Sequence, residues 1–143
     1  MATEGRDGEV EAPEGSRPTT VYDILGGMGF FQELVERFYK RVATDLLLRP
    51  LYPDDLSGSK RHLALFLAQY WGGPTTYSDE RGHPRLRMRH NPFVIGEPER
   101  DAWLRHMNAA IDSLLDECDV HPAVEARLLD YMASAADAMV NAR

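Results

Sequence analysis

From about residue 19 to the end of the chain, apolar side chains recur three or four residues apart, and no segment of any length alternates apolar and polar residues. The first pattern puts apolar groups on one face of an α-helix, whereas alternation is typical of a half-buried strand. The sequence therefore predicts an all-α protein with about four principal helices of roughly 12–20 residues. The expected helices are a short one that Thr20 caps and Gly26-Gly27 ends, residues 29–43, residues 59–70, a short one around 84–90, one that has Pro98 in its first turn and runs to 115, and a last one that Pro122 opens.

Glycine and proline mark where several of these helices end. Gly72-Gly73-Pro74 follows residues 59–70 and stops that helix. Residues 74–84 contain two prolines and no clear period, so we expect them to form a loop. The short helix around 84–90 is expected to end at His90, because Asn91-Pro92 follows and a proline disfavours helical geometry at the residue before it.

The composition is ordinary for one soluble domain, since 43% of the 143 residues are hydrophobic and 27% are charged. Residues 1–18 differ from the rest, because Met1 and Val10 are their only sizeable apolar groups and five acidic residues stand against two arginines. Such a segment cannot bury enough surface to offset its ordering entropy. We therefore expect a disordered acidic tail over residues 1–18 and a folded domain over residues 19–143.

The single cysteine, Cys118, excludes an internal disulfide and a Cys-rich zinc site, and no Cys-x-x-Cys-His sequence is present for covalent haem attachment. The net charge of −7 disfavours a general nucleic-acid-binding role. There is no long apolar run, so neither a transmembrane helix nor a signal peptide is expected, which predicts no stable membrane insertion and a cytoplasmic location.

His90 ends a short stretch that is rich in arginine, within a chain that is acidic elsewhere. An imidazole nitrogen can bind iron and guanidinium groups can bind carboxylates, so one segment could serve both the iron and the propionates of a haem. Taken alone, however, a histidine at a helix end is more often a surface or capping group, and arginines are more often part of a solvated face. The segment by itself leaves both interpretations open.

Five segments, in this order, resemble the truncated haemoglobins of group II, the O type. They are Phe38-Tyr39, Tyr52-Pro53, Gln69-Tyr70-Trp71-Gly72-Gly73-Pro74, Arg85-Leu86-Arg87-Met88-Arg89-His90 and Asp101-Ala102-Trp103-Leu104. The resemblance covers about residues 19–143 and is specific because separate segments agree in order and spacing. It implies a short globin whose helices pack two over two around a haem.

The resemblance also implies roles for individual residues. His90 would be the iron ligand of a haem b, and Tyr39, Tyr52 and Trp103 would line the side where a gas binds. Arg87 would hold a propionate, whereas His62 departs from the arginine or lysine that relatives often carry at the propionate edge. The remaining positions expected to contact the cofactor are Phe38, Leu63, Phe66, Leu67, Tyr77, Met88, Phe93, Met107 and Ile111.

The three distal residues have plainer interpretations as well. Tyr39 lies beside the apolar stripe of residues 29–43, and Trp103 lies on the apolar face of its own helix, so each could be a core residue. With a haem present, their polar hydrogens would donate to a bound ligand, and a donor to a charged acceptor contributes about 1.5–3 kcal/mol. Three donors over one small ligand predict retention rather than the quick exchange of a simple oxygen shuttle.

Three functional hypotheses follow. The first is a haem protein that binds dioxygen, nitric oxide and carbon monoxide and converts nitric oxide with dioxygen to nitrate, for which a separate reductase would be needed. The second is a slow peroxidase, which the absence of an evident distal histidine base weakens. The third is a cofactor-free helical module whose arginine-rich segment meets an acidic partner. Truncated haemoglobins often self-associate, so the resemblance also implies that this chain could form a homo-oligomer.

Overall fold

The computed structural model describes residues 19–142, in which seven α-helices, one 3₁₀ helix and no β-strand are present. The all-α prediction is confirmed, and the expected acidic tail at 1–18 lies outside the described residues. The elements are α1 (Val21–Ile24), α2 (Met28–Val42), η1 (Arg49–Leu51), α3 (Ser57–Tyr70), α4 (Thr76–Arg81), α5 (Leu86–His90), α6 (Glu97–Leu115) and α7 (Pro122–Ala138).

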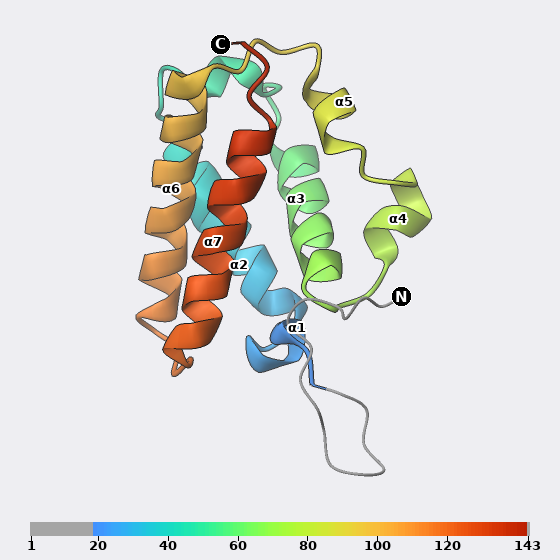
Figure 1. Ribbon diagram of the computed structural model, residues 1–143, viewed down its shortest axis with the longest axis vertical. Helices are drawn as coiled ribbons and strands as arrows, with labels where there is room; N and C mark the ends of the chain where they lie inside the picture. Colours follow the sequence, from blue (N-terminus) through green and yellow to red (C-terminus); the bar gives the residue numbers. More distant parts are fainter. Residues whose placement is uncertain (1–18, 143) are drawn as a thin grey trace.

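The four long helices, α2, α3, α6 and α7, are the ones that the apolar periodicity predicted. Helix α2 packs against α3 and α6, and α6 packs against α7 (Figure 1). The apolar stripe predicted for α2 faces this core, and all five of its members are buried: Phe31, Leu34, Val35, Phe38 and Val42. Burial of one such side chain contributes roughly 1.5–3 kcal/mol, so this stripe is a main source of stability.

The glycine turn that follows α3 packs against the short helix α1. Thr20 and Asp23 form a reciprocal capping box at the start of α1, and the Tyr22 backbone N–H donates to the Trp71 carbonyl at 2.9 Å. Gly72 has φ +104°, and a Cβ there would lie 2.5 Å from Thr20 Cβ. At Gly73 a Cβ would lie 2.6 Å from the Tyr22 ring. The two glycines are therefore required by close approach.

The prediction of an uninterrupted loop over residues 74–84 is wrong, because Thr76–Arg81 form α4. The third residue of this helix, Ser78, has a backbone N–H with no partner inside its own helix, and it donates to Gln69 Oε1 on α3 at 3.0 Å. Gln69 Nε2 also donates to Ser78 Oγ at 2.8 Å. A cap that comes from a different helix is not visible in the local sequence.

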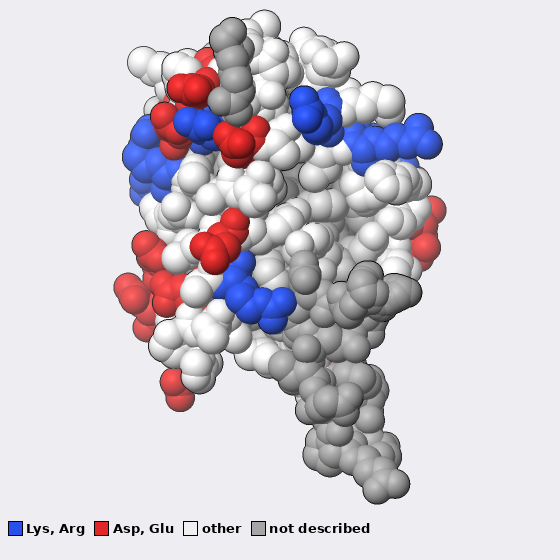
Figure 2. Space-filling view, in the orientation of Figure 1, with Lys and Arg blue, Asp and Glu red and all other residues white. Residues whose placement is uncertain are grey.

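The surface is unevenly charged. On the face shown in Figure 2, acidic side chains gather over α6 and α7 with lysine and arginine side chains among them, while the charged side chains beside α5 are basic. Among residues 19–142, no helix combines the length and the apolar character that crossing a membrane requires.

Candidate functional site

A cavity of about 370 Å³ lies beside α3, between α5 and the ends of the other long helices. This volume is within the range of ligand pockets, roughly 300–1,000 Å³. Its wall is mostly aromatic and aliphatic, with a few polar groups at separate places. The lining residues include Tyr39, Leu51, Tyr52, Ser59, His62, Leu63, Phe66, Leu67, Tyr77, Arg81, Leu86, Arg89, His90, Phe93, Ile95, Trp103, Tyr131, Met132 and Met139.

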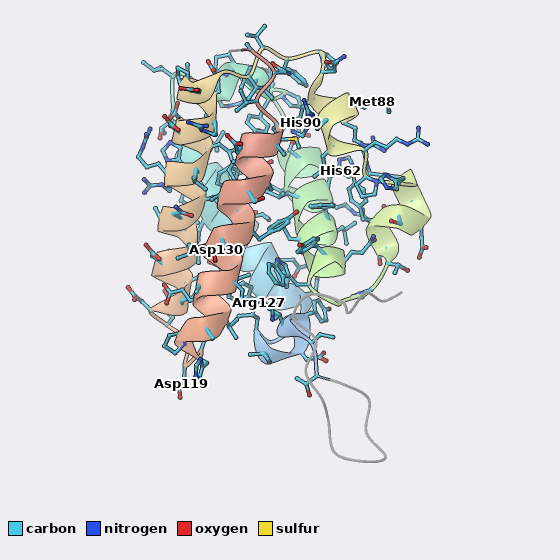
Figure 3. The ribbon with its side chains drawn as sticks, viewed as in Figure 1. His62, Met88, His90, Asp119, Arg127 and Asp130 are labelled. Carbon is cyan, nitrogen blue, oxygen red and sulfur yellow. The ribbon has the colours of Figure 1, made fainter. Side chains whose placement is uncertain are left out.

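His90 reaches this cavity from the last turn of α5, close to α3 and α7 (Figure 3). Its Nδ1 lies 2.7 Å from the backbone carbonyl oxygen of Leu86. Because a carbonyl can only accept, Nδ1 must carry a proton, and in the neutral imidazole Nε2 then has a free lone pair. This is the arrangement that a histidine needs to bind a metal, with the second nitrogen fixing the tautomer and the ring orientation.

The three predicted distal residues lie together on another part of the wall. The Tyr39 and Tyr52 rings meet edge to face with centroids 5.4 Å apart, and Phe38 lies 5.4 Å from Trp103 in the same manner. Tyr52 is hydrogen bonded to both Tyr39 and Trp103. Indole can only donate, so the Tyr52 oxygen accepts from Trp103, whereas either phenol can donate in the bond between Tyr39 and Tyr52.

Burial keeps both phenols protonated. It raises the pKa of Tyr39 well above its ordinary value, with the nearby Tyr52 adding to the effect. Burial also raises the pKa of Tyr52 to about 12, against the opposite influence of its hydrogen bonds with Tyr39 and Trp103. Both hydroxyl groups therefore remain available as donors at physiological pH.

The polar edge of the cavity is formed by His62, Arg81 and Arg89. Arg81 donates from Nη1 to His62 Nε2 at 3.0 Å, and burial, followed by the charge of Arg81, lowers the pKa of His62. Arg89 is held by backbone carbonyls, at 2.7 Å to Pro84 and 3.0 Å to Arg81. Among the residues that the structure describes, Arg81 Nε is a buried atom without a hydrogen-bond partner, so it retains the capacity to bind an anion.

The residues that the sequence predicted fall into three groups. Most line the cavity, namely Tyr39, Tyr52, His62, Leu63, Phe66, Leu67, Tyr77, His90, Phe93 and Trp103. Phe38, Met107 and Ile111 are fully buried in the core behind the wall. Arg87 and Met88 are exposed on α5 and do not line the cavity, Met88 being 60% exposed. Arg81 and Arg89 occupy the place on the cavity wall that was expected for Arg87.

One residue that holds the site together was not predicted from the sequence. Asn141, after α7, donates from Nδ2 to the Phe93 carbonyl at 2.9 Å and accepts at Oδ1 from the Ile95 backbone N–H at 2.8 Å. It thereby anchors the segment that follows His90. Asn141 lies 46 residues from Ile95, so no local pattern could have indicated this contact.

Taken together, the side chains suit a haem. A histidine with a free Nε2 provides an iron ligand, arginines at one edge suit carboxylates, and aromatic and aliphatic walls suit a porphyrin face. The cluster of Tyr39, Tyr52 and Trp103 provides donors for a polar ligand.

Comparisons with known proteins agree with this geometry. The bacterial-like globin family matches residues 20–141. The group 2 truncated haemoglobin YjbI of Bacillus subtilis is 43% identical over 107 residues, which cover 75% of this chain and 80% of that protein.

Solved structures give the same result. The thermostable haemoglobin of the actinobacterium Thermobifida fusca has a TM-score of 0.80 and 52% identity, over 85% of this chain and 97% of that one. The truncated oxygen-avid haemoglobin of Bacillus subtilis has a TM-score of 0.78 and 38% identity, over 85% and 99%. The predicted truncated-globin fold is confirmed by these structures.

Proposed function

Because this chain belongs to the bacterial-like globin family, as a truncated haemoglobin of group II, we propose that it binds haem b through His90 and retains dioxygen by hydrogen bonds from the cluster of Tyr39, Tyr52 and Trp103. Globins of this family are haem proteins that bind oxygen-type ligands. The proposal adds the identity of the haem, the residues that hold it and the strength of ligand retention.

The observation that carries the proposal is the pairing of two features in one cavity. In its neutral form His90 presents an Nε2 lone pair, because its Nδ1 donates to the Leu86 carbonyl. Tyr39, Tyr52 and Trp103 line the same cavity and present polar hydrogens. When bound through His90, the haem would supply an iron that can take a diatomic ligand.

Within the distal cluster, Tyr52 has a distinct part. We infer that its oxygen accepts from both Tyr39 and Trp103, which leaves its own hydroxyl proton to donate to a ligand. Two donors to that oxygen also polarise the hydroxyl group, which strengthens the bond it can give. A donor to a partly anionic dioxygen contributes about 1.5–3 kcal/mol, so release would slow by roughly ten- to a hundredfold.

At the edge of the cavity, we assign the propionates to Arg81 and Arg89 in preference to Arg87. Arg81 has a buried Nε without a partner in the described structure, and Arg89 is fixed by backbone carbonyls.

The oxygen-avid name of the Bacillus subtilis relative supports slow release in this chain as well.

Firm retention of dioxygen also suits a reaction with nitric oxide. One dioxygen and one nitric oxide combine with one electron to give nitrate, so repeated turnover requires a separate reductase. The distal donors would hold the dioxygen in place while nitric oxide enters, and carbon monoxide would bind at the same position as a competitor.

The first test is the visible absorption spectrum of the purified chain with added haemin, in ferric, dithionite-reduced and carbon monoxide forms. We expect a Soret band that shifts on reduction and again with carbon monoxide, and that is lost or strongly weakened in His90→Ala. His83→Ala is the matched control, because His83 precedes α5 and does not line the cavity. A chain that stays colourless would contradict the proposal and favour a cofactor-free helical module.

A further inference from the structure

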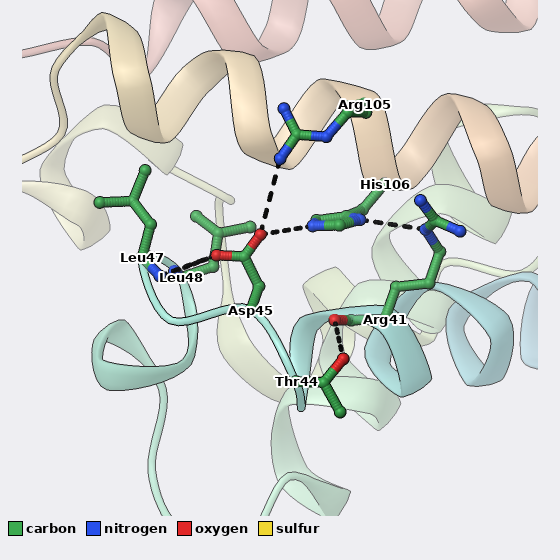
Figure 4. Close-up of polar contacts among 7 residues, drawn as sticks. All are labelled: Arg41, Thr44, Asp45, Leu47, Leu48, Arg105 and His106. Carbon is green, nitrogen blue, oxygen red and sulfur yellow. Dashed lines mark hydrogen bonds and ion pairs between the residues drawn. The ribbon is translucent and has the colours of Figure 1, made fainter.

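A chain of polar contacts lies outside the cavity and joins α2, the turn after it, and α6 (Figure 4). Arg41 Nε donates to His106 Nδ1 at 3.0 Å, and His106 Nε2 donates to Asp45 Oδ2 at 2.6 Å. Arg105 Nη2 lies 3.7 Å from the same carboxylate oxygen. Since arginine can only donate, His106 must accept at Nδ1 and is a neutral imidazole with its proton on Nε2.

Asp45 uses its other oxygen to shape the turn that leads to Tyr52. Its Oδ1 accepts from the backbone N–H groups of Leu47 at 2.8 Å and Leu48 at 2.9 Å. Its backbone carbonyl accepts from the Arg49 N–H at 2.9 Å, which begins η1. Tyr52 follows η1 directly, and its N–H donates to the Arg49 carbonyl at 3.2 Å. The position of Tyr52 therefore depends on how Asp45 is held.

The contacts are buried enough to constrain that position. The side chains of His106 and Asp45 are each only 11% exposed. The hydrogen bond from His106, together with those from Leu48 and Leu47, lowers the pKa of Asp45 to about 2, so the carboxylate stays ionised at physiological pH. A short hydrogen bond to a charged, mostly buried acceptor is among the stronger polar contacts in a protein.

Two of the three elements that these contacts join, α2 and α6, carry distal donors, and the third, the turn at Asp45, leads to Tyr52. Tyr39 is on α2 with Arg41, Trp103 is on α6 one turn before His106, and Tyr52 follows the turn that Asp45 shapes. We propose that His106, acting through Asp45, is a positioning residue that sets the Tyr52 hydroxyl against Tyr39 and Trp103. The inference rests on the proposed ligand-binding function of that cluster.

A second set of hydrogen bonds from α2, to Ser113 on α6 and to Glu117 just after it, provides a matched control. Arg37 on α2 donates to Ser113 Oγ at 3.2 Å, near the C-terminal end of α6, and to Glu117 Oε1 at 2.9 Å, just after that helix. It joins the same two helices but does not touch the turn at Asp45. Loss of these hydrogen bonds should leave the distal cluster unchanged. The control therefore distinguishes an effect on the position of Tyr52 from a general loss of stability between the two helices.

The test compares four variants by the C–O stretching frequency of the carbon monoxide complex and by the rate of dioxygen release. His106→Leu cannot donate to Asp45, and Asp45→Ser can still accept from the Leu47 N–H but is too short to reach His106. We expect both to raise the C–O frequency, as loss of a hydrogen bond to the ligand does, and to speed dioxygen release about tenfold. His106→Gln restores a donor and should recover most of the original values, and Arg37→Gln should change neither.

The proposal is overturned if His106→Leu and Asp45→Ser bind haem with unchanged frequency and release, or if Arg37→Gln produces the same shift. If the chain takes up no haem, the proposed function fails, yet the positioning can still be read in the haem-free protein. The indole proton of Trp103 donates to Tyr52, and its nuclear magnetic resonance shift should move in His106→Leu and return in His106→Gln. An unmoved indole resonance would overturn the inference.

Discussion

For single residues in the distal cluster, the direction of each hydrogen bond decides which group can serve a ligand. In the arrangement proposed above, Tyr39 and Trp103 both donate to the Tyr52 oxygen, so they support Tyr52 more directly than they support a ligand. A ligand would then accept a hydrogen bond from Tyr52, which Tyr39 and Trp103 strengthen by donating to the Tyr52 oxygen. The resemblance put these three residues at one site, each as a donor to the ligand.

This ranking gives a prediction for two conservative variants. Tyr52→Phe removes the donating hydroxyl and should speed dioxygen release by roughly ten- to a hundredfold. Tyr39→Phe removes only a supporting bond and should speed release by a smaller factor, about two- to fivefold, through weaker polarisation of Tyr52. Stopped-flow release into carbon monoxide measures both. A larger effect in Tyr39→Phe than in Tyr52→Phe would mean that Tyr39 donates to the ligand itself.

His90 illustrates what the sequence can supply at this scale and what it cannot. The resemblance identified the residue, but the partner of its Nδ1, the Leu86 carbonyl, depends on backbone geometry. For the propionate contact, the residue that the resemblance suggested, Arg87, does not line the cavity. Arg85, Arg87 and Arg89 alternate along α5, and a helix of five residues spreads them around its surface, so only the structure shows that Arg89 faces the cavity.

At the scale of elements, the long helices were predictable because each buries an apolar stripe that repeats at helical spacing. Helix α4 was not, since Tyr77 is its only buried residue and its cap comes from Gln69 on α3. The sequence predicted that α3 ends at the glycine turn. It could not show that the absence of side chains at the turn also leaves space for Thr20 and Tyr22, because that contact joins distant parts of the chain.

That contact leads to a prediction on stability. Gly72→Ala combines a left-handed backbone with a Cβ 2.5 Å from Thr20 Cβ, so we expect it to lower the free energy of unfolding by about 2–4 kcal/mol. Gly26→Ala is the control, because Gly26 also has a positive φ, +101°, but no atom lies within 4 Å of its added Cβ. It should cost about 1 kcal/mol. Urea denaturation gives both values, and equal losses would show that Thr20 moves aside freely.

At the scale of the whole molecule, stability is unevenly distributed around the cavity. Helices α2, α3, α6 and α7 share the buried core, whereas α5, which carries His90, has no buried residue. The segment around α5 is held by polar contacts instead, from Asn141 to the Phe93 carbonyl and from Arg89 to the Pro84 carbonyl. Figure 1 shows α4 and α5 to one side of the long helices.

The haem should therefore stabilise different parts of the molecule to different extents. A ligand that binds only the folded state adds about 4 kcal/mol at a thousandfold excess over its dissociation constant. In α5 the gain should be largest, because a bond from His90 to iron and the porphyrin face would supply the apolar contacts that this helix lacks. In the core of α2 and α6 these contacts already exist, so local opening there changes less.

Amide hydrogen exchange with and without haemin measures this difference directly. We expect protection of residues 86–95 to rise at least tenfold on haemin addition, and protection in the middle of α2 to rise by a smaller factor. The His90→Gly variant, which keeps the cavity but lacks the iron ligand, should show little rise around α5. If α5 is equally protected before haemin is added, then Asn141 and Arg89 suffice to fix it, and the proximal histidine is preorganised by the protein alone.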